Sequence, residues 1–205
     1  MKLKHSFDRI LSFLALVAAT PLLVVIAIAI KVDDGGPVIF RQERLGLKGR
    51  RFVLWKFRTM VPDADRYLDE RGRVVGGNRI TSVGRFLRVY GLDELPQLVN
   101  VLRGEMSLVG PRPALPEHLD RYTGEQRRRL SVRPGITGLA QIAGRNRLPW
   151  SHRIEQDLEY IRRPSLWLDL KILAVTVGVV LSGQGVVLDR NPDEADDLRP
   201  KGGSP

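Results

Sequence analysis

An uncharged apolar stretch near the N-terminus limits what this chain can fold into more than any other feature. Residues 10–30 contain no charged side chain, and as an α-helix they would extend about 31 Å, which matches the hydrocarbon thickness of a bilayer. A cleaved signal peptide is a competing interpretation, because Ala27 and Ala29 resemble a cleavage site. Signal peptides, however, have shorter apolar cores of about 7–15 residues. We therefore expect residues 1–32 to anchor the chain in a membrane.

The flanks and the midpoint of this stretch predict how it lies in the membrane. Three basic residues precede it and six follow it within positions 31–51. Because Lys and Arg favour the cytoplasmic side, both ends are expected there. Thr20-Pro21 lies at the midpoint, where proline removes a helical hydrogen bond and the threonine hydroxyl can satisfy a freed carbonyl. These features favour a re-entrant helix-break-helix in one leaflet, with a straight single span as the alternative.

The remaining composition narrows the kinds of partner and of chemistry. The chain has a net charge of +10, and because residues 189–205 are acidic, residues 1–188 carry 30 basic and 18 acidic side chains, a net charge of +12. Such an excess predicts a polyanionic partner, which can be nucleic acid, an anionic membrane or a phosphate-bearing substrate. There is no cysteine and there are three histidines, which excludes disulfides and thiolate catalysis and leaves no ligand set for structural zinc.

The pattern of the rest predicts a mostly α fold with a small β-hairpin, of the α+β class, with interfacial amphipathic helices. Residues 38–42 and 52–57 read as paired strands. Helices are predicted at 62–71, 81–90, 96–103, 115–122, 125–130 and 152–162. Thr81 or Ser82 is the expected cap of the second of these, and Gly104 is expected to end the third. The apolar run 172–181 is too short to span a bilayer, so it is a core helix or an interfacial one. Residues 33–188 then form one domain, and the polar segment 189–205 is a disordered tail.

Two adjacent carboxylates are the first candidates for chemistry. Asp93 and Glu94 stand just ahead of a predicted helix with Pro96 in its first turn, so they lie near the positive end of its dipole. On its own this pattern is also that of a simple N-cap. The neighbouring arginines, Arg85 and Arg88, favour phosphate and a divalent metal instead. A carboxylate so placed can attack phosphorus, provided that cations neutralise the two approaching anions.

Two proline-containing segments follow the carboxylates. Arg112 stands between Pro111 and Pro113, and this stiff backbone suits a guanidinium that must hold phosphate. Residues 133–138, Arg-Pro-Gly-Ile-Thr-Gly, predict a tight loop that glycine permits. The run 127–129 of three arginines is expected to form a solvated or membrane-facing charged surface.

Five motifs together resemble those of a known family. They are Gly-Pro-Val-Ile-Phe-x-Gln-x-Arg-x-Gly at 36–46, Lys-Phe-Arg-Thr-Met at 56–60, Leu-Asp-Glu-Leu-Pro-Gln at 92–97, Gly-Pro-Arg-Pro at 110–113 and Arg-Pro-Gly-Ile-Thr-Gly at 133–138. In this order, behind an apolar segment with a central proline, they resemble the bacterial sugar transferases known as monotopic phosphoglycosyl transferases. The similarity runs from about residue 5 to 188.

The resemblance implies a reaction and residue roles. Such enzymes transfer a sugar 1-phosphate from a UDP-sugar to undecaprenyl (polyprenyl) phosphate and release UMP, the first membrane step of bacterial glycoconjugate or exopolysaccharide assembly. Asp93 matches the nucleophile that forms a covalent phosphosugar intermediate. Glu94 matches the second carboxylate, a Mg²⁺ ligand or proton-handling group, and Arg112 matches the arginine that grips phosphate. Thr20-Pro21 matches the Ser-Pro break of the family's re-entrant helix.

The same resemblance places the enzyme on the cytoplasmic face of the bacterial inner membrane, where a soluble donor meets a lipid phosphate. The side chains expected to hold the phosphates of the two substrates are Lys56, Arg58, Arg85, Arg88, Arg112, Gln141 and Arg145. One departure is Val89-Tyr90-Gly91, where the family has a Lys/Arg-Thr/Ser-Ser-like stretch. That difference puts the local loop geometry in question more than the chemistry.

Two other functions are alternatives to this one. A non-catalytic membrane-tethered basic module that binds nucleic acid or anionic lipid explains the charge of +12 but not the carboxylate pair. Aromatic residues, which single-strand binders use for stacking, make up only 6% of the chain, so nucleic acid is not the expected partner. An inactive scaffold with the same fold is disfavoured by the intact carboxylate pair. The sugar, the glycan pathway and the oligomeric state have no signature in the sequence.

Overall fold

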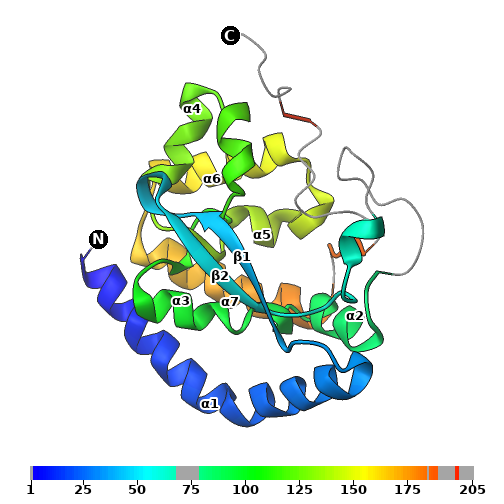
Figure 1. Cartoon of the computed structure of the whole chain (residues 1–205). Coiled ribbons are helices and arrows are strands. Elements are labelled where there is room, and N and C mark those ends of the chain that lie inside the picture. The colour runs from blue at the N-terminus through cyan, green and yellow to red at the C-terminus, as the bar shows by residue number, and fades with distance from the viewer. Residues whose placement is uncertain (1, 68–78, 184, 189–196, 199–205) are drawn as a thin grey trace.

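The N-terminal apolar segment forms one long helix beside a compact domain. The computed structural model describes residues 2–67, 79–183, 185–188 and 197–198 of the 205-residue chain. Helix α1 (Lys2–Asp34) runs along one side of the domain and bends about midway, with its hollow side facing the domain (Figure 1). Within the described residues it is the one helix long and apolar enough to cross a membrane.

The predicted helix break takes the form of a bend within a continuous helix. Pro21 lies inside α1 and the helix continues past it. The hydroxyl of Thr20 donates to the carbonyl of Leu16, four residues back, at 2.9 Å. The carbonyl that loses its helical hydrogen bond is that of Val17, because Pro21 has no amide hydrogen. Threonine bonds of this kind are known to bend helices. Helix α1 is therefore one bent helix, and not the predicted pair of helices separated by a break.

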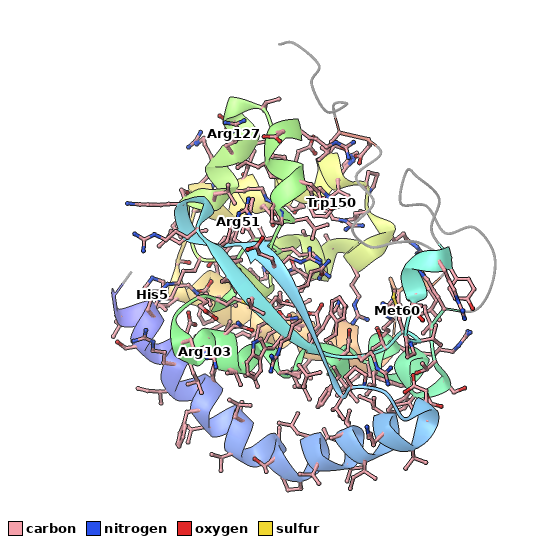
Figure 2. The ribbon with its side chains drawn as sticks, viewed as in Figure 1. His5, Arg51, Met60, Arg103, Arg127 and Trp150 are labelled. Atoms are coloured by element: carbon pink, nitrogen blue, oxygen red, sulfur yellow. The ribbon has the colours of Figure 1, made fainter. Side chains whose placement is uncertain are left out.

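Both ends of α1 are fastened to the same domain. Near its start, Lys4 Nζ lies 2.7 Å from the carboxylate of Asp169, and near its end Asp34 pairs with Arg58. In Figure 2 the label of His5 lies near the start of α1, and the label of Met60 lies on the side where α1 ends. Most of the outer face of α1 is apolar and exposed, with Ile10, Phe13, Val25 and Ile28 each more than half accessible. The inner face, which includes the fully buried Ser12, packs on the domain.

The predicted hairpin is confirmed. Strands β1 (Ile39–Leu45) and β2 (Arg51–Phe57) pair antiparallel, with Ile39 opposite Phe57 and Leu45 opposite Arg51. Phe52 and Leu54 on β2 point into the main core, as the alternation of a half-buried strand requires. Phe57 falls outside this alternation and packs in a separate cluster with Ile26, Ile30 and Leu87.

The helices around the site begin and end at the predicted signals. Helix α2 (Ser82–Val89) is capped by Thr81, whose hydroxyl accepts from the Gly84 amide. Helix α3 (Gln97–Arg103) ends at Gly104, which adopts a left-handed conformation with φ of 78°. Helices α6 (Trp150–Arg162) and α7 (Leu166–Ser182) begin earlier than the predicted segments 152–162 and 172–181. Trp150, at the start of α6 (Figure 2), is fully buried.

The prediction of a loop at 133–138 was wrong in part. Strand β4 (Gly135–Thr137) lies there and pairs in parallel with β3 (Ser107–Val109). A Cβ on Gly135 would lie 2.1 Å from the Gly110 nitrogen, so close backbone approach, and not a turn, calls for this glycine. The segments predicted to be helical at 115–122 and 125–130 are helical, but largely as 3₁₀ helix: Pro116–Arg121 in the first, and α4 (Gly124–Arg127) followed by Arg128–Ser131 in the second.

Two further predictions fall partly outside the described residues. Of the helix expected at 62–71, the described part is a single 3₁₀ turn, Ala64–Tyr67. Of the predicted disordered tail at 189–205, only Asp197 and Leu198 are described, and both dock on the domain. Leu198 is 6% exposed and packs in a cluster with Leu45 and Trp150.

Candidate active site

The two carboxylates singled out in the sequence line a cavity of about 360 Å³, a size typical of small-molecule sites. Its walls come from β2, the segment between α2 and α3, β4, α5 (Leu139–Gly144), α7 and the residues after α7. The lining combines charged side chains with apolar ones. The predicted site residues that line it are Lys56, Arg88, Asp93, Glu94, Arg112, Gln141 and Arg145.

A tight turn places the carboxylate pair. Gly91 adopts a left-handed conformation with φ of 61°, and the chain then makes a 3₁₀ turn, Leu92–Glu94, before α3 begins. A Cβ on Gly91 would meet Arg145 Nη2 at 3.1 Å. The departure at Gly91 therefore has a local reason, because the backbone conformation and the nearby guanidinium both favour glycine.

Asp93 is buried in an unusual way for a carboxylate. Its side chain is 9% exposed, and no hydrogen bond to it is found within the described part of the chain. Burial, together with the neighbouring charge of Glu94, raises the pKa of Asp93 to about 6, against the opposing effect of Lys56, Arg88 and Arg112. Buried carboxylates are normally paired or hydrogen-bonded, and a carboxylate with a perturbed pKa in a cavity is typical of functional sites.

Glu94 and Arg112 form an ion pair in the lining of the cavity. Glu94 Oε1 accepts from Arg112 Nη1 at 3.2 Å, and both side chains are 25% exposed. Prolines on both sides restrict the backbone of Arg112. Exposure of this degree leaves the guanidinium accessible to an incoming phosphate.

A buried ion pair, Arg129 with Asp157, contacts the backbone of Arg112. Arg129 Nη2 donates to the Arg112 carbonyl at 2.9 Å and to Asp157 Oδ2 at 2.5 Å, and Arg129 Nη1 donates to the Tyr122 hydroxyl at 2.6 Å. Although burial opposes it, the charges of Tyr122 and Asp157 raise the pKa of Arg129. The prediction of a solvated 127–129 surface is thus wrong for Arg129, which is 1% exposed, although Arg127 and Arg128 are exposed.

Sequence reasoning missed Arg129 and Asp157 as supports of the site. Asp157 had a usable signal, because it lies on the buried stripe of α6 with Ile154 and Leu158. A charged residue at an apolar position of a helix implies a buried partner. Arg129 had none, since it stands among three identical residues of which two face solvent.

Arg145 reaches across the cavity to the turn that holds the carboxylates. Its Nη1 donates to the Val89 carbonyl at 3.0 Å. Its backbone has φ of 52° and ψ of −130°, a strained conformation for a residue other than glycine, and such strain is frequent at functional sites. Burial lowers the pKa of Arg145, and Glu94 and Asp93 oppose that effect. The guanidinium is therefore held beside both carboxylates.

The remaining predicted residues divide between the cavity and its surroundings. Arg88 lines the cavity and donates from Nε to Thr59 Oγ1 at 2.8 Å. Gln141 also lines it, with both polar side-chain atoms buried and without a hydrogen-bond partner in the described part of the chain. Arg58 is buried and pairs with Asp34, and Arg85 is exposed on α2; the structure places both outside the cavity lining.

Comparison with known proteins gives consistent matches. The model of a family described as bacterial sugar transferase matches residues 1–183. An uncharacterized sugar transferase, EpsL, of Bacillus subtilis is 45% identical over 188 residues, which cover 91% of this chain and 91% of that protein.

Two longer relatives carry the names of activities. One is UDP-glucose:undecaprenyl-phosphate glucose-1-phosphate transferase of Xanthomonas campestris, 45% identical over 85% of this chain and 38% of that protein. The other is undecaprenyl-phosphate galactose phosphotransferase of Salmonella typhimurium, 40% identical over 89% of this chain and 41% of that protein. The chain spans less than half the length of these two.

Proposed function

The chain belongs to the bacterial sugar transferase family, and from that membership we propose that it transfers a sugar 1-phosphate from a UDP-sugar to undecaprenyl phosphate and releases UMP. Relatives named for this type of reaction with glucose and with galactose match most of the chain. The observation that carries the proposal is Asp93, a buried carboxylate with no hydrogen bond from the described residues, in a cavity lined by cations.

The first step uses Asp93 as a nucleophile. One of its carboxylate oxygens attacks the phosphorus that bears the sugar, the bond from that phosphorus to the UMP oxygen breaks, and UMP leaves as the anion. Arg112, Arg88 and Lys56 line the same cavity and offset the negative charge that builds up in this step. The product is an acyl phosphate between Asp93 and the sugar phosphate.

The second step restores the enzyme. An oxygen of undecaprenyl phosphate attacks the same phosphorus, the acyl-phosphate bond breaks, and the Asp93 carboxylate is regenerated. The acid dissociation of Asp93 near pH 6 makes it a better leaving group than an alcohol and keeps it ionised at neutral pH.

Magnesium fits the residues present. Glu94 has one oxygen in the ion pair with Arg112 and is a quarter exposed toward the cavity, and no group of three metal-ligating side chains is found in the described ranges. A site of this kind is typical of Mg²⁺ held by one or two carboxylates plus substrate phosphates. Glu94 and the donor diphosphate would hold the ion, which would neutralise phosphate charge.

The anchoring of α1 supports a re-entrant arrangement on the cytoplasmic face. A straight helix of 33 residues would extend about 50 Å and put its ends on opposite sides of a bilayer. Lys4 and Asp34, however, contact the same domain, which favours both ends on one side. Basic residues around both ends favour the cytoplasm.

The test is UMP release from UDP-glucose and UDP-galactose, first without and then with undecaprenyl phosphate. Without acceptor, wild-type protein should release at most one UMP per enzyme and retain the sugar phosphate covalently, which mass spectrometry detects on the peptide that contains Asp93. Asp93→Asn should abolish both, and EDTA should stop UMP release until Mg²⁺ is added.

Two results would count against this function. Full turnover by Asp93→Asn would refute the nucleophile, and unchanged Mg²⁺ dependence in Glu94→Gln would refute the metal ligand. Salt-sensitive nucleic-acid binding without any UMP release would favour the basic-module alternative.

A further inference from the structure

The segment after α7 turns back into the active-site cavity. Gly183 ends α7 in a left-handed conformation with φ of 64°. Gly185 is also left-handed, with φ of 77°, and Val186 and Val187 then line the same cavity as Asp93. These residues follow position 183, where the match to the family model ends. They are thus part of the site without being part of the matched region.

A close backbone contact fixes the start of this segment. A Cβ on Gly185 would lie 3.0 Å from the Gly144 carbonyl oxygen and 3.5 Å from Arg145 Cβ. Gly183 likewise leaves room for Val89, whose Cγ1 would lie 2.9 Å from an added Cβ. The segment therefore lies against Val89 and Arg145, which a hydrogen bond joins, and the two valines that follow line the same cavity as the carboxylate pair.

A second attachment holds the chain further along. The two carboxylate oxygens of Asp197 accept hydrogen bonds from the Trp150 and Ser151 amides at 3.1 and 2.8 Å, at the start of α6. Leu198 is buried beside Trp150, and its carbonyl accepts from Arg121 Nη2 at 3.0 Å. Both ends of this part of the chain are thus attached to the domain.

The surface that the valines present is apolar. Val179 and Val180 of α7 line the same cavity as Val186 and Val187, and these four side chains are called the valine wall below. UDP and a sugar carry polar groups that would lose their hydration against such a wall without forming hydrogen bonds. An isoprenoid chain, in contrast, gains from this burial.

Helix α7 also carries exposed apolar side chains that are suited to contact with lipid. On the outer side of α7, Trp167 is 78% exposed, and Val177 and Leu181 are 59% and 71% exposed. Apolar exposure on this scale is typical of a membrane-facing surface. The C-terminal end of α7 thus has lipid-compatible side chains outside and the valine wall inside.

We propose that Val186 and Val187, with Val179 and Val180, bind the first isoprene units of the undecaprenyl phosphate acceptor and so direct its phosphate toward Asp93. This inference rests on the proposed function. The contact of Gly185 with Gly144 and the attachment at Asp197 and Leu198 hold the wall in place.

The test separates the two half-reactions. The double variant Val186→Thr/Val187→Thr keeps the side-chain shape and adds two hydroxyls, so the KM for undecaprenyl phosphate should rise at least about tenfold, as expected for a polarity mismatch in an apolar pocket. The UMP burst without acceptor should keep its amplitude and rate, which also shows that the variant is folded. Val53→Thr, on the exposed face of β2, is the matched control and should change neither.

Two further measurements identify the contact. Farnesyl phosphate has only the first three isoprene units, so its KM should rise by the same factor if the valines contact those units. Leu198→Ala, which loosens the second attachment, should raise the acceptor KM in the same direction while the burst remains.

Three results would overturn the inference. They are an unchanged acceptor KM with an intact burst, a rise in KM for the UDP-sugar instead, and a rise for undecaprenyl phosphate but not for farnesyl phosphate. Failure of the wild-type protein to release UMP from any UDP-sugar would refute the proposed function itself.

Discussion

Removing the charge of Asp93 should stabilise the protein while it abolishes activity. The folded-state pKa of Asp93 is about 6, against an ordinary value of 3.8. Each unit of difference corresponds to about 1.36 kcal/mol, so ionised Asp93 costs the folded state about 3 kcal/mol. Asp93→Asn has no charge to bury and should regain most of this free energy.

The difference in stability between Asp93→Asn and the wild type should depend on pH. Because folding raises the pKa of Asp93, its protonation favours the folded state; this contribution to the free energy of unfolding is present below about pH 4 and is lost as the pH rises through 6. The variant and the wild type should therefore unfold at similar temperatures at pH 4 and differ most above pH 7. For a chain of this size, about 3 kcal/mol corresponds to a rise in Tm of roughly 6–12 °C.

The control is the other buried carboxylate near the site. Burial raises the pKa of Asp157 to about 6 as well, but unlike Asp93 it bonds the equally buried Arg129 at 2.5 Å. Asp157→Asn therefore leaves a buried guanidinium without its counter-charge and should lose about 3–5 kcal/mol. Thermal unfolding of the three proteins in the same detergent, followed by circular dichroism at pH 4, 6 and 8, measures both effects. A lower Tm for Asp93→Asn at pH 8, or a difference that does not change with pH, would refute the reasoning.

Other predictions concern the rate of the UMP burst. Because the ionised form of Asp93 attacks, the single-turnover rate should fall about tenfold per pH unit below pH 6; a constant rate down to pH 4.5 would contradict the raised pKa. Arg112→Lys loses the guanidinium fork and should slow the burst about 100-fold, and near-normal single-turnover kinetics would argue against phosphate contact. Gly91→Ala should lower the free energy of unfolding by about 1 kcal/mol and slow the burst, because its φ is 61° and the new Cβ would lie 3.1 Å from Arg145 Nη2. Gly124→Ala, where a Cβ meets nothing, is its control in urea unfolding and burst assays, and equal effects of the two changes would show that Gly91 has no special role.

The parts of this fold that the sequence predicts are those set by neighbouring residues. The cap at Thr81, the helix end at Gly104 and the hairpin each depend on a few adjacent side chains. The pairing of β3 with β4 depends on segments more than 25 residues apart in sequence, and short buried strands carry no periodic signal. The burial of Arg129 likewise depends on Asp157, 28 positions away. The carboxylate pair was predicted because arginines stand close to it in the sequence and because it lies in a motif that resembles a known family, whereas the contacts of Arg129 and Asp157 depend on tertiary packing.

Side-chain contacts link the position of α1 to the position of two cations that line the cavity, Lys56 and Arg112. At one end, Asp34 pairs with Arg58, two residues after Lys56. At the other, Lys4 pairs with Asp169, and the Tyr160 hydroxyl joins Asp169 to the Val109 carbonyl, three residues before Arg112. A shift of either end of α1 relative to the domain would therefore move a cation of the site or break a buried ion pair, which costs several kcal/mol. In the proposed reaction the acceptor phosphate lies at the headgroup level, so the depth of α1 in the leaflet determines the depth at which that phosphate meets Asp93.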